Sequence, residues 1–325
     1  MNSIRFFMAY SLLIAVQSCY GLSFVTVHKT GVVKTTTINQ TELDTLSSTQ
    51  ILPEKPQKPP YVKIITHDGF EIGYHFFDRN SSNLIIVGPG IMNQADHFLW
   101  VAKLFPTYDI VLMDFRWKNM GNFLLSSATL KNPKQALLHG VAYDVQAIIK
   151  YTALPRHTKI SGYGYCYGGW IFALFQAARP TGRLFDFLIF DSMPESLGNL
   201  LNNILKDPNL AGPREASESG LLKYLTGFAP TRKLVTAVIT QALTDFSIAP
   251  ALKTITIPTL FIHGKNDRVV LINQLYRNFG YCASKQKIAF LTNCEHVENH
   301  RHQPALFSGV CQKFIEGTLV DSLFS

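Results

Sequence analysis

A cysteine between two closely spaced glycines is the most reactive arrangement in this sequence. Residues 164–168 read Gly-Tyr-Cys-Tyr-Gly, after a short apolar run typical of a strand and before one typical of a helix. In this context a G-x-nucleophile-x-G stretch predicts a strained turn that lifts the central side chain clear of the backbone. A side chain at Gly164 or Gly168 would strike the strand or the helix. Cys166 is therefore the candidate nucleophile, because a thiolate attacks acyl carbons.

Such a nucleophile needs a base that takes its proton and an acid that orients the base. Asp267 lies in a loop after the buried run Thr259–His263 and directly before a predicted helix, which it is also suited to cap. Asp191 follows the preceding predicted strand and is the alternative acid. We interpret His263, which comes before the acid loop, as a structural hydrogen-bonding residue.

His296 is the candidate base. It follows the last predicted strand, and the closing helix is expected to begin soon after it, at Gln303. His300 and His302 are nearby alternatives, although a surface histidine near a helix start needs no catalytic role. In the predicted reaction His296 deprotonates the thiol, the acyl group passes to Cys166 as a thioester, and water activated by the same imidazole hydrolyses that thioester.

The oxyanion of such a reaction is expected to bind two backbone N–H groups. One belongs to Tyr167, directly after the nucleophile. The other should come from the loop after the Asn83–Val87 strand, which reads Gly-Pro-Gly-Ile. Because Pro89 has no N–H, Ile91 is the first choice and Gly90 the second.

The elbow, the acid loop and the histidine, in that order over about residues 61–318, resemble the α/β-hydrolase superfamily. The cysteine in the elbow is similar to that of dienelactone hydrolases, which lack a large cap of the kind expected below. The segment 114–116, Asp-Phe-Arg, also resembles the superfamily, but Trp117-Lys118 replaces the usual Gly-rich continuation. The resemblance implies an α/β-hydrolase fold and a Cys166–His296–Asp267 triad acting on a carboxylic ester or thioester.

Strand-like and helix-like runs alternate along most of the chain. After a hairpin signal at His67-Asp68-Gly69, this alternation predicts a mostly parallel sheet covered by helices on both faces. The expected strands are Tyr61–Thr66, Glu71–Phe77, Asn83–Val87, Asp109–Asp114, Lys159–Tyr163, Leu184–Phe190, Thr259–His263 and Lys287–Leu291, and the expected helices include Asp96–Leu104, Pro133–Ala153 and Gln303–Glu316.

Residues 193–250 interrupt the alternation with several helical runs between two core strands. A plain connection needs far fewer residues, so we predict a helical cap. Its apolar residues favour an apolar acyl substrate, although they could simply pack the cap on the core. The core then comprises 61–192 and 251–325, preceded by a signal peptide at 1–21 and an extended leader at 22–60.

The N-terminus predicts export. Arg5 precedes an apolar run of about a dozen residues and a small-residue exit, shorter than the ~20 residues that span a bilayer. A buried first helix is the alternative interpretation. Val16–Cys19 also resembles a bacterial lipobox, in which case Cys19 would carry a lipid. We therefore expect an exported protein that is secreted, periplasmic or lipid-anchored, with membrane association through the signal or the anchor.

Export would place the five cysteines in an oxidising environment. With Cys19 lipidated or removed and Cys166 catalytic, three others remain. Cys282, Cys294 and Cys311 predict one disulfide and one free thiol, in a pairing that the sequence leaves open.

The composition favours a small-molecule enzyme over a nucleic-acid-binding protein. The 325 residues carry a net charge of +8, but Lys and Arg occur in no run longer than two. A nucleic-acid interface would want a basic stripe, so the expected partner is a small, apolar acyl substrate. His97, His139 and His157 are isolated, and we expect no metal and no organic cofactor.

Three functions fit these residues. The first is a hydrolase for an ester, lactone or thioester, and the second is an acyltransferase in which an alcohol or amine replaces water. The third is a catalytically inactive binding protein, because an unusual nucleophile can also mark lost activity. The acid and the histidine favour an enzyme. Because a thiolate leaves more readily than an alkoxide, thioesters, strained lactones and activated esters are the favoured substrates.

Overall fold

The structure, a computed structural model, describes residues 23–27, 33–37, 57–91, 93–116, 140–178, 184–206, 247–302 and 304–319. The predicted signal segment 1–21, with Cys19, lies outside the described residues. So do Trp117-Lys118, His139 and most of the predicted cap, from 207 to 246.

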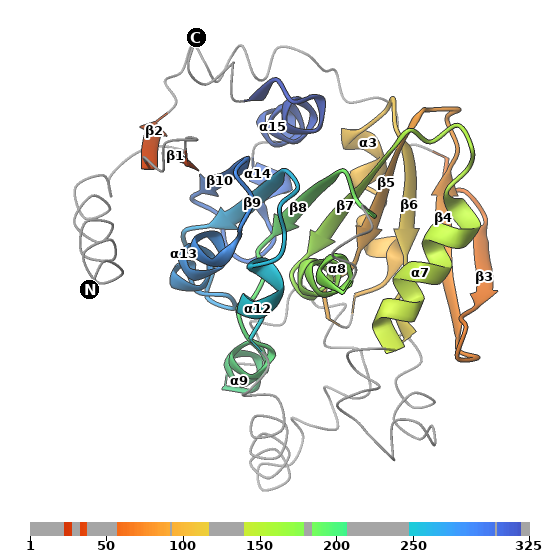
Figure 1. The fold of residues 1–325 in the computed structure, drawn as a ribbon, viewed down its shortest axis with the longest axis horizontal. Helices are drawn as coiled ribbons and strands as arrows, with labels where there is room; N and C mark the ends of the chain where they lie inside the picture. Colours follow the sequence, from red (N-terminus) through yellow and green to blue (C-terminus); the bar gives the residue numbers. More distant parts are fainter. Residues whose placement is uncertain are drawn as a thin grey trace, which may run out of the picture.

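The described strands form one sheet (Figure 1). Its order is β2-β1-β10-β9-β8-β7-β5-β6-β4-β3. Strands β5 to β10 run parallel, and an antiparallel hairpin closes each edge. Each predicted strand corresponds to an observed one, and the expected mostly parallel sheet is confirmed. The strands are β1 Ser23–Val27, β2 Val33–Thr37, β3 Tyr61–Ile65, β4 Glu71–Phe77, β5 Asn83–Gly88, β6 Asp109–Met113, β7 Lys159–Tyr165, β8 Phe187–Asp191, β9 Thr259–Gly264 and β10 Lys287–Thr292.

The hairpin β1–β2 was not predicted by the sequence. It lies within the expected leader, and β1 pairs antiparallel with β10, with Ser23 opposite Leu291. The partner strand is more than 200 residues away. Because strand formation depends on such long-range pairing as well as on local preference, the local pattern of the leader could not reveal it.

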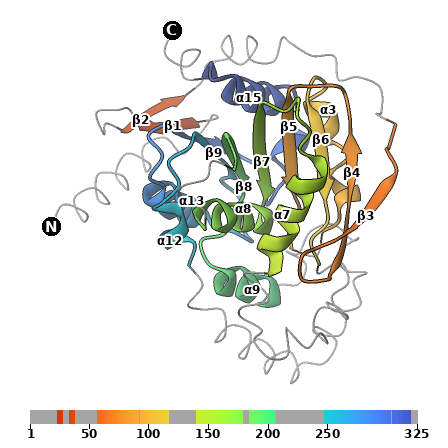
Figure 2. The same cartoon turned by 45° about the vertical axis from the view of Figure 1, so that its right-hand side comes forward.

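Helices cover both faces of the sheet, as the alternation predicted (Figure 2). The central strands are buried on both sides, so that Leu84 and Ile86 of β5 face one apolar cluster while Ile85 and Val87 face the other. On the first face lie α7 Val141–Thr152, α8 Tyr167–Ala177, α12 Ala249–Leu252 and α13 Ile272–Tyr281, and on the second lie the 3-10 helix η1 Ala95–Phe98, α3 Val101–Leu104 and α15 Pro304–Glu316.

One predicted helix is divided in the structure. The run Asp96–Leu104 forms η1 and α3, and α3 ends where Pro106 disfavours a helical conformation for Phe105. The predicted closing helix Gln303–Glu316 is observed as α15, which starts at Pro304 because proline suits a first helical turn. The short helix α14, Asn299–His302, precedes it and was not predicted. The predicted helix Pro133–Ala153 is observed as α7, and its expected start lies outside the described residues.

The predicted insertion, residues 193–250, leaves the core and returns to it at one place. Its first run is confirmed as α9, Leu197–Lys206. Ser196 pairs with Ser247, and the Ile248 N–H donates to the Glu195 carbonyl at 2.9 Å. The two ends of the insertion are therefore closed onto each other, after the carboxyl end of β8. The cap beyond α9 stays a prediction.

The predicted disulfide is wrong for the cysteines that the structure describes. Cys166, Cys282, Cys294 and Cys311 are all free. Cys282 packs in the apolar cluster on one face of the sheet and Cys311 in the cluster on the other, so the sheet itself separates these two thiols. Burial raises the pKa of Cys282, Cys294 and Cys311, which disfavours their reactive thiolates.

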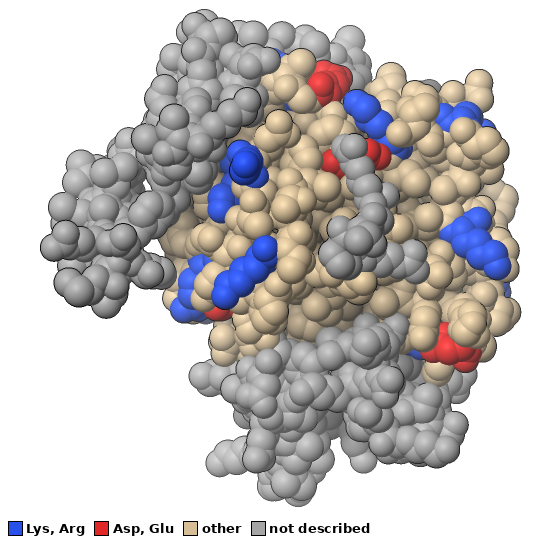
Figure 3. All heavy atoms as spheres, viewed as in Figure 1, with Lys and Arg blue, Asp and Glu red and all other residues tan. Residues whose placement is uncertain are grey.

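Charged side chains are dispersed over the face in Figure 3, where Lys and Arg lie among uncharged residues with Asp and Glu nearby. Within the described ranges, no helix is long and apolar enough to cross a membrane. The same residues bring together no group of three His, Cys, Asp or Glu side chains that could hold a metal ion.

Candidate active site

Cys166 occupies a strained turn between β7 and α8. Its φ is 50° and its ψ is −111°, a conformation that costs a non-glycine residue on the order of 1–3 kcal/mol. The Cys166 N–H donates to the carbonyl of Asp191 at the end of β8, at 2.7 Å. This neighbouring strand therefore helps to hold the strained residue in place.

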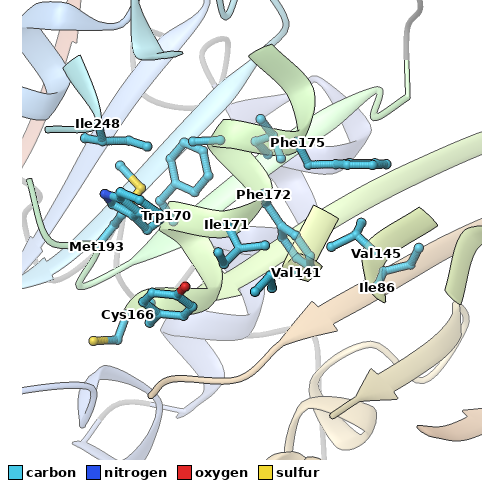
Figure 4. Packing of buried hydrophobic residues seen from close by; sticks show 14 of the residues in the cluster. Ile86, Val141, Val145, Cys166, Trp170, Ile171, Phe172, Phe175, Met193 and Ile248 are labelled. Atoms are coloured by element: carbon cyan, nitrogen blue, oxygen red, sulfur yellow. The ribbon is translucent and has the colours of Figure 1, made fainter. Parts of the chain in front are cut away.

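The two glycines of the elbow have no room for a side chain. A Cβ on Gly164 would lie 2.3 Å from the Cα of Gly169, and one on Gly168 would lie 2.1 Å from the carbonyl oxygen of Gly88. Both contacts are with backbone, which confirms the tight turn predicted from the sequence. Figure 4 shows Cys166 at the start of α8, with its sulfur directed away from the packed side chains of Ile171 and Phe172.

Asp267 and His296 meet at the carboxyl ends of the adjacent parallel strands β9 and β10. The His296 Nδ1–H donates to Asp267 Oδ2 at 2.7 Å. Asp267 Oδ1 accepts the N–H groups of Val269 and Val270 at 2.9 and 2.8 Å. The carboxylate is buried, and these bonds fix its orientation. Asp267 is not the helix cap that the sequence suggested, because the next helix, α13, starts at Ile272 with Leu271 as its N-cap.

The charges around His296 favour its protonated form. Burial alone would lower the pKa of the imidazole from its ordinary 6.5. The Asp267 carboxylate and the Cys166 sulfur, which both attract and hydrogen-bond the ring, outweigh burial and raise this pKa to about 10. The structure therefore brings Cys166, His296 and Asp267 into one electrostatically coupled group. Burial opposes ionisation of Asp267, but His296 keeps its pKa below the usual range.

His263 plays the structural part expected of it. Its Nε2–H donates to the Val270 carbonyl at 2.8 Å, while Asp267 Oδ2 lies farther away, at 3.7 Å. Burial lowers the pKa of the imidazole, so the ring is neutral beside the acid.

Neither alternative residue takes the place of the base or the acid. The His300 ring stacks on Trp100, with centroids 3.5 Å apart and planes 6° apart, and burial lowers its pKa to about 3. The Asp191 carboxylate is buried and accepts hydrogen bonds from Tyr163 and Asn299, at 3.0 and 2.8 Å. The side chain of His302 lies outside the described residues.

The loop expected to supply the second oxyanion donor packs against the elbow. A Cβ on Gly90 would lie 3.6 Å from the Cys166 Cβ. The Asn93 N–H donates to the Gly90 carbonyl at 3.2 Å, which closes a turn around Ile91. Gly90, Ile91 and the Tyr167 N–H after the nucleophile therefore stay the candidate donors of the hole.

The sequence did not indicate the hydrogen-bond network that supports the loop containing His296. The Asn299 side chain donates to Asp191 and accepts a hydrogen bond from the Thr292 hydroxyl. The Tyr165 hydroxyl donates to the carbonyl of Val297, directly after the candidate base. The alternation of Tyr163 and Tyr165 along β7 could have indicated a shared face, but nothing in the sequence indicated their partners.

The stability of the protein should depend on the protonation of Asp191. Burial raises its pKa from 3.8 to about 7, although Tyr163, Asn299 and Ser192 partly oppose the rise. A carboxyl with a raised pKa in the folded state lowers stability as pH rises from about 4 to 7. Asp191→Asn imitates the protonated form, so at pH 8 but not at pH 4 it should raise the free energy of unfolding relative to wild type, by up to about a few kcal/mol, and with it the melting temperature.

The measurement is thermal unfolding of both proteins across this pH range, with ester turnover recorded alongside. If Asp191 were the catalytic acid, Asp191→Asn would lose turnover as severely as a change at Asp267. An equal change in melting temperature at pH 4 and pH 8 would contradict the raised pKa.

No family model and no curated protein sequence matches this chain. Solved structures do match its fold. An esterase of Pyrococcus furiosus superposes with a TM-score of 0.58 at 14% identity, over 80% of this chain and 91% of that one. A membrane phospholipase A, described as a bacterial virulence factor, gives 0.57 at 18% identity over 97% and 98%. An esterase from Exiguobacterium antarcticum gives 0.55 at 14% identity over 78% and 99%.

These similarities, together with the strand order, show that the chain has the α/β-hydrolase fold. At such identities the likeness concerns the fold.

Proposed function

We propose that this protein is a hydrolase that cleaves a carboxylic ester, lactone or thioester through an acyl-thioester on Cys166. The observation that carries the proposal is the meeting of three groups at the carboxyl ends of the parallel strands β7, β9 and β10. His296 is bonded to Asp267 at 2.7 Å, and its pKa is raised by Asp267 and by the sulfur of Cys166 in the strained elbow. A nucleophile, a base and an orienting acid in this order are what acyl transfer requires.

In the first half of the reaction, the proton of Cys166 lies on His296 and the sulfur attacks the acyl carbon as a thiolate. A carbon–sulfur bond forms and the carbonyl electrons move onto oxygen. When this oxyanion collapses, the bond to the leaving group breaks and the imidazolium gives that group its proton. Asp267 keeps the imidazole in one orientation and stabilises its charge.

The oxyanion would be bound by the N–H of Tyr167 and by that of Ile91 or Gly90. The position of Gly90 beside Cys166 supports this assignment. Fixed donors of this kind stabilise a developing charge without any reorganisation.

In the second half, water loses a proton to neutral His296 and attacks the thioester. The thiolate then leaves and the free acid is released. Forming a thioester from an ordinary ester is uphill, so we favour activated acyl groups such as thioesters, strained lactones and aryl esters. The cysteine elbow is similar in this respect to that of dienelactone hydrolases.

An acyltransferase would use the same acyl-enzyme, with an alcohol or an amine in place of water. An inactive binding protein remains the contrasting hypothesis. The strained φ of Cys166 and the bonded acid–base pair support an enzyme, because a fold that only bound a ligand would gain nothing from either.

Several matched structures are esterases or a phospholipase by their own descriptions, which supports an acyl substrate here. We propose that the substrate is small and apolar, and that the chain is exported through its N-terminal segment. Association with a membrane through that segment or a lipid on Cys19 is part of the same proposal.

Turnover of activated acyl compounds tests this function. We expect release of p-nitrophenol from p-nitrophenyl butyrate and of thiophenol from S-phenyl thiobutyrate, with butyric acid as the second product. The assay is run with and without glycerol and followed by chromatography of the products. Butyryl glycerol as the main product would favour the acyltransferase, and no turnover of either compound would favour the binding protein.

A further inference from the structure

The residue directly before the candidate nucleophile reaches the loop of the candidate base. The Tyr165 hydroxyl donates a hydrogen bond to the carbonyl of Val297, and His296 precedes Val297 in the chain. We propose that Tyr165 is a positioning residue that holds His296 against Cys166. This inference deepens the proposed function and rests on it for its catalytic meaning.

Val297 needs such a restraint because its backbone is strained. Its φ is 55°, in the left-handed region that a β-branched residue rarely adopts. A conformation of this kind costs on the order of 1–3 kcal/mol and persists only when its surroundings over-determine it. The carbonyl that Tyr165 binds belongs to the peptide directly after Val297. The hydrogen bond therefore holds the chain on the far side of the strained residue and opposes relaxation of the loop.

Tyr165 is itself well fixed. Its side chain is buried and its ring packs edge-on against Phe98, with centroids 4.9 Å apart and planes at 81°. Trp100 packs on the same ring at 6.1 Å. Burial raises the pKa of the phenol well above its usual value, so the hydroxyl keeps the proton that it donates.

The loop has a second anchor farther along. Asn299 donates to Asp191 at 2.8 Å, and Asp191 also accepts a hydrogen bond from Tyr163 at 3.0 Å. Tyr163 and Tyr165 are alternate residues of β7 and pack in the same apolar cluster. Of these two tyrosine hydroxyls, Tyr165 binds the residue next to the base, while Tyr163 binds a carboxylate on β8. Tyr163 is therefore a natural comparison for the loss of a buried hydroxyl.

The charged groups around His296 determine how displacement of this residue would change the reactivity of Cys166. The titratable groups that interact with His296 are Cys166, Asp191, His263 and Asp267. If the loop relaxes, the imidazolium moves away from the sulfur, and the thiolate loses its positive partner. Cys166 should then react more slowly with an alkylating agent. The effect should be largest at mildly acidic pH, where a thiol without a positive partner is mostly protonated.

Tyr165→Phe tests the inference with little change of shape. We expect kcat for p-nitrophenyl butyrate to fall about ten-fold or more, with a smaller change in KM, because the base rather than the binding site is displaced. Iodoacetamide alkylation, followed by mass spectrometry of the peptide that contains Cys166, should slow at pH 6 and change little at pH 9. Tyr163→Phe should lower the melting temperature comparably but keep the alkylation profile within about two-fold of wild type.

A second variant keeps the test informative if Tyr165→Phe is poorly folded. Val297→Gly removes the strain, because glycine adopts a positive φ freely. In that background the loss of the Tyr165 hydroxyl should slow pH 6 alkylation less than it does in wild type. Equal effects of Tyr165→Phe and Tyr163→Phe on the alkylation profile would overturn the inference. The alkylation profile can be measured without a substrate. A protein that turns over no ester would therefore overturn the proposed function, while the alkylation profile would still test the role of Tyr165.

Discussion

Cys166→Ala is expected to reduce kcat for activated esters by on the order of 10⁴ to 10⁶, leaving the protein folded. The sulfur is the atom that forms and breaks the bond to the acyl group, so no other group can take over its covalent step. Removal of one methyl-sized thiol from a site where Cys166 is only 4% exposed leaves a small cavity at the start of α8. Circular dichroism and the melting temperature check the fold, and the release of p-nitrophenol checks the rate.

A matched control separates chemistry from packing. Cys282→Ala removes another buried thiol, 2% exposed, in the same apolar cluster but at the end of α13. It should lower stability to a similar degree and leave turnover unchanged. Retention of turnover by Cys166→Ala, or an equal loss in both variants, would exclude Cys166 as the nucleophile.

Asp267→Asn should have the second largest effect, a fall in kcat on the order of 10³ to 10⁴. The Asp267 charge is the main influence that raises the pKa of His296 to about 10 against the opposing effect of burial. Without this charge only Cys166 opposes the effect of burial, so the pKa of His296 should fall well below about 10. The imidazole then neither holds one orientation nor keeps a positive charge beside the sulfur.

Proton NMR of the His296 ring as a function of pH measures this change directly. The comparison is Asp191→Asn, which removes a neighbouring buried carboxylate and should keep most of the turnover. An unchanged His296 pKa in Asp267→Asn, or a greater loss of activity in Asp191→Asn, would contradict the assignment of Asp267 as the acid.

The raised pKa of His296 also links stability to pH. Because its value in the folded state, about 10, exceeds the 6.5 expected when unfolded, the imidazolium contributes its full stabilisation below about pH 6.5. That contribution is lost as pH rises through 10. In Asp267→Asn it should shrink, so the variant should lose less stability than wild type between pH 7 and pH 10.

The positions of the three candidate catalytic residues could be predicted from the sequence because each depends on local signals. Gly164 and Gly168 mark a turn that excludes side chains, and the loops with Asp267 and His296 follow runs that read clearly as strands. In a parallel sheet the carboxyl ends of neighbouring strands share one edge. Their order along the chain was thus enough to bring the acid and the base together.

What the sequence missed depends on contacts between distant segments. The hairpin β1–β2 pairs with β10, and the Tyr165 hydroxyl binds Val297, 132 residues away. The disulfide prediction failed for the related reason that counting thiols says nothing about which face of the sheet each occupies. Local composition does not encode such partners, because the tertiary fold alone brings them into reach.

In the proposed reaction Cys166 carries the acyl group. The most direct test mixes the protein with p-nitrophenyl butyrate, quenches in acid before deacylation is complete, and analyses the digested protein by mass spectrometry. A butyryl group on the peptide that contains Cys166, absent after Cys166→Ala, is the predicted result. Ester turnover with the acyl group on another residue, or with none bound to the protein, would contradict the assignment of Cys166 as the nucleophile.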